Sequence, residues 1–322
     1  MGPWGTSGQM RARRSGGLRV LGLGAWAFLL VACEVAQITV EQPEARVVAE
    51  IYLRVTNDLP EGVALLHQTP GEGRVDLERA RVRVTDSQGL TVSFSPAPIF
   101  ECAEGALPPE FDAVCLLLDA GAAEVVRPGG RYRVEVDLPD DRRIQGAVTL
   151  PEDFRIEQPV PGATRCRIVP NQLLPIRWSV AVGARAYVPE AEIFGLKTAL
   201  EPEGISVPSD PVTLLGLSVS ESDTEIIFPS QFGIFNRFSS DRDVLVALQQ
   251  GLPALGDLEG EVIVSAQGRN AVNWNRGGNF NPSGTIRVPS LFGDGTGVVG
   301  GIVNRSFGFT TRDVAGNPPC LP

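Results

Sequence analysis

Apolar and polar residues alternate along much of the chain, which predicts β-strands with one buried face. In residues 45–57 every second position is apolar, and the positions between are mostly polar or charged. Residues 79–94 and 131–138 repeat this pattern, and residues 144–150 form a further predicted strand. Asp86 to Gly89 interrupts residues 79–94 with turn-forming residues, so we expect a hairpin there. Short strands separated by turns are typical of β-sandwiches.

One stretch, after residue 239, has the pattern of a helix. Ser240 is the expected N-cap, Asp243 its capping-box partner, and Gly251 the residue that stops the helix. Four apolar residues lie on one side of it: Val244, Leu245, Ala247 and Leu248. We expect this helix to cover an edge or an end of a sheet. Elsewhere 36 glycines and 26 prolines break the chain into short pieces, which favours an all-β fold.

The N-terminal pattern differs from the rest because it is basic and then wholly uncharged. The apolar run covers residues 20–32 and carries no charge, and it follows four arginines: Arg11, Arg13, Arg14 and Arg19. This run is shorter than the about 20 residues that a membrane-spanning helix needs. It matches the apolar part of a signal peptide. A short N-terminal membrane anchor or a buried core helix is the alternative.

Ala32 and Cys33 close the apolar run and resemble the lipobox of bacterial lipoproteins. The resemblance implies cleavage of residues 1–32 as a signal peptide, a lipid on the Cys33 sulfur, and residues 33–44 as a tether. Several acyl chains on one residue would anchor the protein stably without a spanning segment. The expected location is therefore the bacterial cell envelope. Glu34 in place of an aspartate favours the outer membrane, on its periplasmic or surface face, while its acidic character leaves the inner membrane open.

The residues after the leader are predicted to hold two domains. The chain of 322 residues less the leader of 32 leaves 290, which exceeds the usual size of one domain. The two domains are expected to meet near residues 152–162, where Pro151, Pro159 and Pro161 favour a semi-rigid linker. We therefore expect two β-sandwich domains, residues 45–155 and residues 156–322, with one short helix in the second.

Two motifs carry a resemblance to known β-sandwich families. Residues 80–89 and 127–136 resemble the hairpin and the following strand of immunoglobulin-like or transthyretin-like modules of surface lipoproteins. Residues 174–180, with Tyr187 after them, are similar to the first strands of fibronectin type III domains. The second resemblance implies that Trp178 and Tyr187 are core residues. The whole chain resembles, more loosely, a family of two-domain bacterial lipoproteins with no assigned activity.

The charge of the chain argues against two classes of partner. The formal net charge is −10, and loss of the four leader arginines brings it to about −14. Nucleic acids and anionic lipid surfaces are therefore not expected as partners. The expected partners are the membrane, through the N-terminal lipid, and envelope proteins or glycans.

The four cysteines other than Cys33 predict two disulfide bonds, because an even number of cysteines in an oxidising compartment is usually paired. Cys102 and Cys115 flank a loop and are the natural first pair. Cys166 and Cys320 are then left for the second pair. A zinc site is the alternative, but the paired C-x₂-C spacing of zinc knuckles is missing.

Motifs for catalysis are weak. His67 is the only histidine and no G-x-S-x-G motif accompanies it, which argues against serine, cysteine and zinc hydrolases. Glycoside hydrolysis needs only two carboxylates, and 38 acidic residues offer pairs such as Glu152 with Asp153 or Asp241 with Asp243. We expect a non-enzyme without catalytic residues, cofactor or resident metal. A carboxylate-dependent hydrolase of the glycoside type is the alternative.

The best candidates for ligand binding lie in the Gly- and Asn-rich residues 268–301. Exposed aromatic rings and amide groups there would stack on a partner or sugar and hydrogen-bond to it. The candidates are Trp274, Asn275, Arg276, Asn279 and Phe280. Alternatively, Trp274 and Phe280 are core residues and the segment only makes turns and short strands. The predicted function is that of a lipid-anchored, non-catalytic interaction or ligand-binding module, with a purely structural envelope protein as a further alternative.

Overall fold

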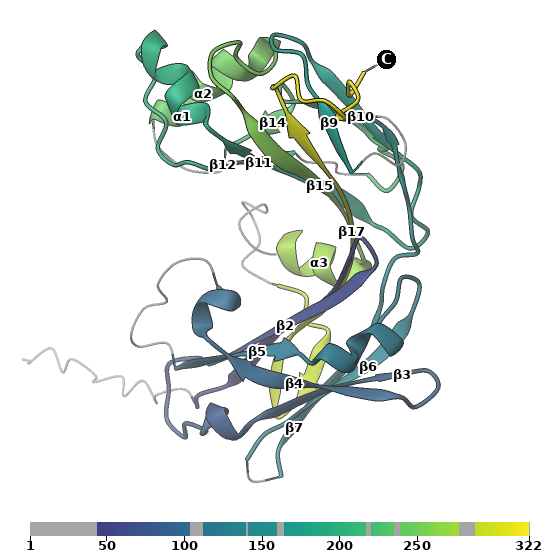
Figure 1. Ribbon diagram of the computed structural model, residues 1–322. Helices are drawn as coiled ribbons and strands as arrows, with labels where there is room; N and C mark the ends of the chain where they lie inside the picture. The colour runs from purple at the N-terminus through teal and green to yellow at the C-terminus, as the bar shows by residue number, and fades with distance from the viewer. Residues whose placement is uncertain are drawn as a thin grey trace, which may run out of the picture. The chain divides into compact units, whose positions relative to one another are not determined.

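Strands dominate the computed structural model and belong to two sheets (Figure 1). The structure describes residues 44–103, 112–139, 141–159, 164–216, 220–234, 239–276 and 287–321. Fourteen of the described strands form one continuous sheet, and three form a second, smaller sheet. Contacts among residues 42–322 make them one compact unit. The predicted all-β class is confirmed.

Nine strands of the large sheet close into a β-barrel. They follow one another in the order β1, β2, β5, β4, β3, β6, β7, β16 and β17, and β17 pairs back onto β1. Their bounds are β1 (Val47–Thr56), β2 (Leu59–Gln68), β3 (Arg81–Asp86), β4 (Thr91–Ala97), β5 (Ala113–Leu118), β6 (Arg131–Asp137), β7 (Arg143–Thr149), β16 (Leu291–Gly293) and β17 (Gly295–Thr310). β1 and β17 run parallel, from Val47 beside Gly295 to Thr56 beside Asn304.

The apolar positions of the alternating pattern form the core of the barrel. In β1 they are at most 1% exposed: Val47, Ala49, Ile51, Leu53 and Val55. The predicted hairpin is present as β3 and β4. The Asp86 carboxylate stabilises its turn by accepting the backbone N–H groups of Gln88 and Leu90. Local signals in the sequence therefore predict these strands and this turn correctly.

The predicted arrangement of two separate β-sandwich domains is wrong. β16 and β17 come from the C-terminal part of the chain, yet they lie between β7 and β1 and close the barrel of the N-terminal strands. β17 begins to pair with β15 (Glu259–Gln267) at Ile302, before its pairing with β1 ends at Asn304, and then continues past the end of β1. Closure pairs the strand edges that an open sheet would leave exposed. An alternating pattern predicts which face of a strand is buried but not which strand lies beside it, so it does not reveal this closure.

Beyond the barrel, β17 lies inside the remaining part of the large sheet. β15 pairs with it on one side, and β9 (Arg165–Arg167) pairs with it on the other. β11 (Ala186–Phe194), β12 (Val212–Gly216) and β14 (Phe232–Gly233) follow β15 in that order. The small sheet consists of β8 (Ile156–Gln158), β10 (Leu174–Trp178) and β13 (Glu225–Phe228). Trp178 and Tyr187, the core residues implied by the fibronectin resemblance, are buried with their ring centroids 5.4 Å apart.

The described residues contain three α-helices where the sequence predicts one. α2 (Ser239–Ala247) matches the predicted helix but begins two residues earlier than an N-cap at Ser240 implies, so Ser240 lies in its first turn. Its extension ends at Gly251, whose φ of 121° is not helical. α1 (Leu196–Leu200) and α3 (Arg269–Arg276) are additional, and α3 occupies the start of the Gly- and Asn-rich segment. None of the described helices is long and apolar enough to cross a membrane.

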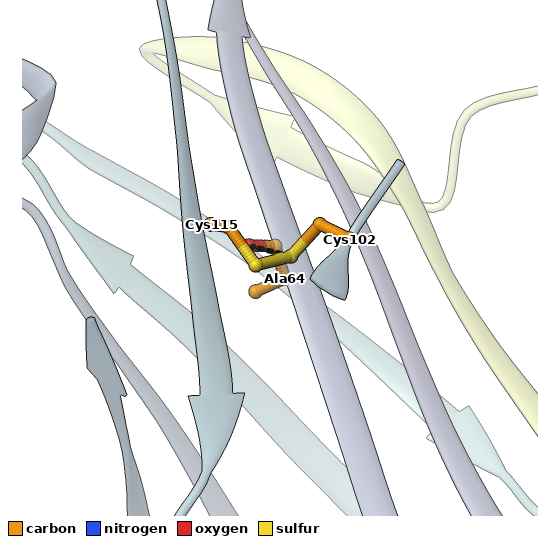
Figure 2. The surroundings of a disulfide bond; sticks show 3 residues. All are labelled: Ala64, Cys102 and Cys115. Carbon is orange, nitrogen blue, oxygen red and sulfur yellow. Dashed lines mark hydrogen bonds between the residues drawn. A yellow bond between two sulfur atoms is a disulfide. The ribbon is translucent and has the colours of Figure 1, made fainter. Parts of the chain in front are cut away.

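Two disulfide bonds join the cysteines in the expected pairs. Cys102 is bonded to Cys115 on β5, beside the Ala64 carbonyl of β2 (Figure 2). Cys166 on β9 is bonded to Cys320 near the C-terminus, across 154 residues of sequence. In the chain-entropy model the short loop stabilises the fold by about 3 kcal/mol and the long loop by about 5 kcal/mol.

Candidate functional site

The structure describes only part of the predicted binding segment. Trp274, Asn275 and Arg276 belong to the second half of α3, whereas Asn279, Phe280 and the predicted lipidation site Cys33 lie outside the described residues. α3 packs against β17 (Figure 1). The Trp274 side chain is only 6% exposed, so its ring offers little surface to a ligand.

Trp274 lies against a cluster of charged side chains between α3 and the barrel. The Glu50 carboxylate on β1 is 3.6 Å from His67 Nε2 and 3.5 Å from Arg287 Nη1. The Arg287 guanidinium lies 5.0 Å from the centroid of the Trp274 ring, a cation–π distance. We call these four residues the Glu50 cluster. A hydrogen bond from His67 and the charge of Arg287 hold the pKa of Glu50 below its usual value of 4.5, although burial opposes them.

The Glu50 cluster is better explained as a contact that holds α3 on the barrel than as a binding site. The negative charge of the Glu50 carboxylate is balanced by the Arg287 guanidinium, so no net negative charge is left for a bound cation. Burial, together with the charge of Glu50, raises the pKa of the neighbouring Tyr52 to about 12. The only histidine of the chain therefore helps to hold α3 on the barrel, and it lies apart from the cavity described next.

A cavity of about 540 Å³ lies near the place where β17 leaves β1. Its walls come from the β1–β2 turn, residues 153–159 and residues 305–308 of β17. The polar lining residues are Asn57, Asp58, Asp153, Arg155, Thr164, Glu261, Arg305 and Ser306. Phe154, Ile156 and Phe307 supply apolar surface. We call this the Arg305 cavity.

Arg305 is the centre of the charge network in this cavity, and its side chain is only 13% exposed. Its Nη2 donates to Asp58 Oδ1 at 2.8 Å and to Asp153 Oδ1 at 2.5 Å. Its Nε donates to Asp153 Oδ1 at 2.9 Å and to the Phe154 carbonyl at 3.1 Å. Within the described ranges, Nη1 has no acceptor. One edge of the guanidinium is therefore fixed, and the other can donate to a bound molecule.

The β1–β2 turn positions the second polar group of the cavity. Asn57 and Asp58 have φ values of 46° and 72°, as in the two-residue turns that join antiparallel strands. The Asn57 amide donates to Ser306 Oγ at 2.8 Å and accepts the Ser306 backbone N–H at 3.1 Å. The Ser306 hydroxyl in turn donates to Glu261. These bonds fix the turn, so that the Asp58 carboxylate, 83% exposed, stands at the rim of the cavity.

The Arg305 cavity combines an arginine donor with carboxylate and amide acceptors beside apolar surface. Hydroxyl groups both donate and accept, so a hydroxyl-rich molecule can bond to both kinds of group at once. Metal binding is less suited to this site, because Arg305 already occupies two of its carboxylates. Groups of three or more metal-ligating side chains are not found in the part of the chain that the structure describes.

The residues that line this cavity are widely separated in the sequence. Of the acidic pair Glu152 and Asp153, only Asp153 lines it. Arg305 is the one charged residue of β17, and an isolated charge in a long apolar strand is the signal that points to it. Its partners come from distant turns, so only the fold brings them together.

Comparisons with known proteins give remote structural likenesses. No family model and no curated protein matches the chain. A DUF4785 family protein from Legionella pneumophila matches with 9% identity and a TM-score of 0.21, over 68% of this chain. This chain spans about half of that protein's length, 51%. Fibronectin(III)-like modules of Clostridium thermocellum CbhA match with 10% identity and a TM-score of 0.19, over 84% of this chain and 96% of theirs. Neither likeness carries information about the function of this chain.

Proposed function

We propose that this chain is a lipid-anchored, non-catalytic binding protein of a bacterial cell envelope, and that the Arg305 cavity takes a hydroxyl-rich ligand such as a glycan. The observation that carries the proposal is the geometry of Arg305. Two carboxylates and a carbonyl hold the guanidinium in place, while Nη1 keeps its hydrogen-bonding capacity. A fixed donor beside fixed acceptors costs little ordering entropy when a ligand binds.

Support for the location comes from the cysteines. All four described cysteines are in disulfide bonds, which form and persist in oxidising compartments. The lipobox resemblance at Cys33 supplies the anchor, and Glu34 favours the outer membrane, on its periplasmic or surface face. The membrane is then a partner through the lipid, and we expect envelope glycans or proteins to reach the cavity.

A carboxylate-dependent hydrolase is the second candidate, because Asp58, Asp153 and Glu261 line the same cavity. Glycoside hydrolysis requires one carboxyl group that carries a proton to the leaving oxygen, and a second that acts as base or nucleophile. Arg305 forms hydrogen bonds with both Asp58 and Asp153, so these two carboxylates already serve to hold the guanidinium in place. We therefore favour binding without turnover. A purely structural envelope protein would bind no ligand in the cavity.

A glycan array probed with the full-length protein tests this proposal. We expect saturable binding of a subset of glycans without release of sugar products. Asp58→Asn should weaken that binding about tenfold, since it removes one charged acceptor. The turn should survive this change, because asparagine tolerates the left-handed conformation of residue 58.

Asp313→Asn is the matched control. Asp313 is as exposed as Asp58, at 86%, and also faces an arginine, Arg167 at 3.6 Å, but it does not line the cavity. Its variant should bind like the parent. Equal binding by the parent and Asp58→Asn, or an array without any bound glycan, would contradict the proposal. Release of reducing sugar that Asp58→Asn abolishes would favour the hydrolase instead.

A further inference from the structure

A second cavity, of about 330 Å³, gathers three arginines from three different elements. Arg131 is the first residue of β6, Arg185 immediately precedes β11, and Arg269 is the first residue of α3. The other lining residues are Ala147, Val148, Thr149, Leu150, Gly183 and Asn270. We call this the three-arginine cavity. It shares no lining residue with the Arg305 cavity.

The backbone brings the three arginines to one place. Arg131 lies directly opposite Thr149 in the β6–β7 ladder. The Arg185 backbone N–H donates to the Gln267 carbonyl at 2.8 Å, two residues before Arg269. Gly268, between Gln267 and Arg269, passes so close to β7 that a Cβ there would lie 3.2 Å from the Thr149 carbonyl oxygen. The segment that follows β15 therefore lies directly beside the end of β7, and this brings the arginines of β6, β11 and α3 together.

The start of α3 is tied down next to the cavity. Asn270 donates from its amide nitrogen to the Ala147 carbonyl of β7 and to the Val299 carbonyl of β17, both at 3.0 Å. One side chain therefore bridges two barrel strands beyond the end of the short β16, which pairs with β7 only from Ile144 to Gly146. The arginines are thus displayed from fixed backbone positions.

The charges in this cavity are not balanced by the protein. Arg185 is paired with Glu221, with 2.6 Å between Nη1 and Oε2. In the described ranges, Arg131 and Arg269 have no acidic partner, and no carboxylate is among the lining residues. Two positive charges therefore remain uncompensated in a chain whose net charge is −10. Like charges that line one cavity repel one another, and a bound anion removes this repulsion.

We propose that the three-arginine cavity binds a phosphoryl group that carries two negative charges. Guanidinium groups bind phosphate oxygens through two parallel hydrogen bonds, and three of them here surround one space. A phosphate monoester carries about −1.5 to −2 charges at pH 7, which matches the two uncompensated arginines. Thr149 is also among the lining residues, and its hydroxyl is a neutral group that can donate a hydrogen bond. This site is independent of the glycan proposal.

Isothermal titration of the full-length protein with inorganic phosphate, at constant ionic strength, tests the proposal. We expect saturable binding that Arg131→Gln and Arg269→Gln each weaken at least about tenfold, as for other hydrogen bonds to charged groups. Arg133→Gln is the matched control. Arg133 is exposed on the same face of β6 as Arg131, and it does not line the cavity, so this variant should bind phosphate like the parent.

A second arm separates a soluble phosphate ester from a lipid headgroup. Vesicles of phosphatidylcholine with and without phosphatidic acid are sedimented with parent protein and variants. Binding of phosphatidic acid vesicles that is lost in Arg131→Gln and Arg269→Gln supports the proposal with a lipid source. Phosphate binding without such vesicle binding supports it with a soluble source. Absence of both, or binding that these two variants leave unchanged, would overturn it.

Discussion

Alanine in place of Gly297 should break the closure of the barrel. Gly297 lies on β17 with a φ of 147°, and its Cα partner on β1 is Ala49. A Cβ at this position would lie 1.9 Å from the Ala49 carbonyl oxygen and 2.7 Å from its carbonyl carbon. Backbone atoms cannot rotate away as a side chain can, so the two strands must separate.

The magnitude follows from two costs. Overpacking of a well-packed site costs about 1–3 kcal/mol, and a strained backbone conformation for a non-glycine residue costs about another 1–3 kcal/mol. Gly297→Ala should therefore lower the free energy of unfolding by about 2–6 kcal/mol. Single domains have about 5–15 kcal/mol in total, so the variant should lose a large part of its stability.

Urea denaturation of Gly297→Ala, followed by circular dichroism, measures this loss, with Gly308→Ala as the matched control. Gly308 lies on the same strand, but a Cβ there would have its nearest neighbour at 3.4 Å, the flexible Arg165 side chain. We expect Gly308→Ala to change the unfolding free energy by less than about 1 kcal/mol. Equal midpoints for the two variants would refute the parallel pairing of β1 with β17.

Three further predictions follow from buried groups. All three tyrosines have a raised pKa, with burial as the main cause, and the pKa of Tyr52 reaches about 12. The neutral tyrosines therefore stabilise the folded state below pH 10, and this contribution to the free energy of unfolding is lost as the pH rises through the folded-state pKa values. Absorbance at 295 nm should therefore show less tyrosinate near pH 10 in the native protein than after unfolding in guanidinium; equal ionisation of the native and the unfolded protein at that pH would contradict this. Glu50 has a lowered pKa, so its contribution is present above the unfolded-state value near 4.5 and is lost as the pH falls. Glu50→Gln should cost about 1–3 kcal/mol at pH 7 and progressively less toward pH 3 in urea denaturation, and a deficit that does not depend on pH would rule out the ion pairs. Tyr132→Phe should cost about 1–2 kcal/mol, because the Tyr132 hydroxyl accepts the Arg127 backbone N–H at 2.8 Å; unchanged stability would show that this bond is dispensable.

Local features of the fold were predictable from the sequence, whereas its closure was not. β1, β6 and the β3–β4 hairpin have alternating patterns and clear turn residues, so each is determined within a short window. β17 carries four glycines among its first seven residues, a composition more typical of turns than of strands. Its glycines are needed because β1, Tyr52 and Ala271 approach the backbone closely. A requirement of this kind is set by distant residues and leaves no periodic signal.

The candidate sites escaped prediction for the same reason. The glycines and asparagines around Trp274 in the sequence allowed two interpretations, an exposed recognition residue or a core residue, and its burial beside Arg287 agrees with the second. Arg305 and its partners Asp58 and Asp153 come from three separate segments. Charge pairs between such segments depend on the fold, and sequence spacing does not indicate them.

The assignment depends most on the lipid anchor that would keep this chain outside the cytoplasm. Mass spectrometry of the intact, unreduced protein, extracted from bacterial membranes, measures it directly. We predict a chain that begins at Cys33, carries a thioether-linked diacylglycerol on that residue and retains two disulfide bonds. A chain that keeps residues before Cys33, or that has an unmodified thiol at Cys33, would contradict the proposed anchor.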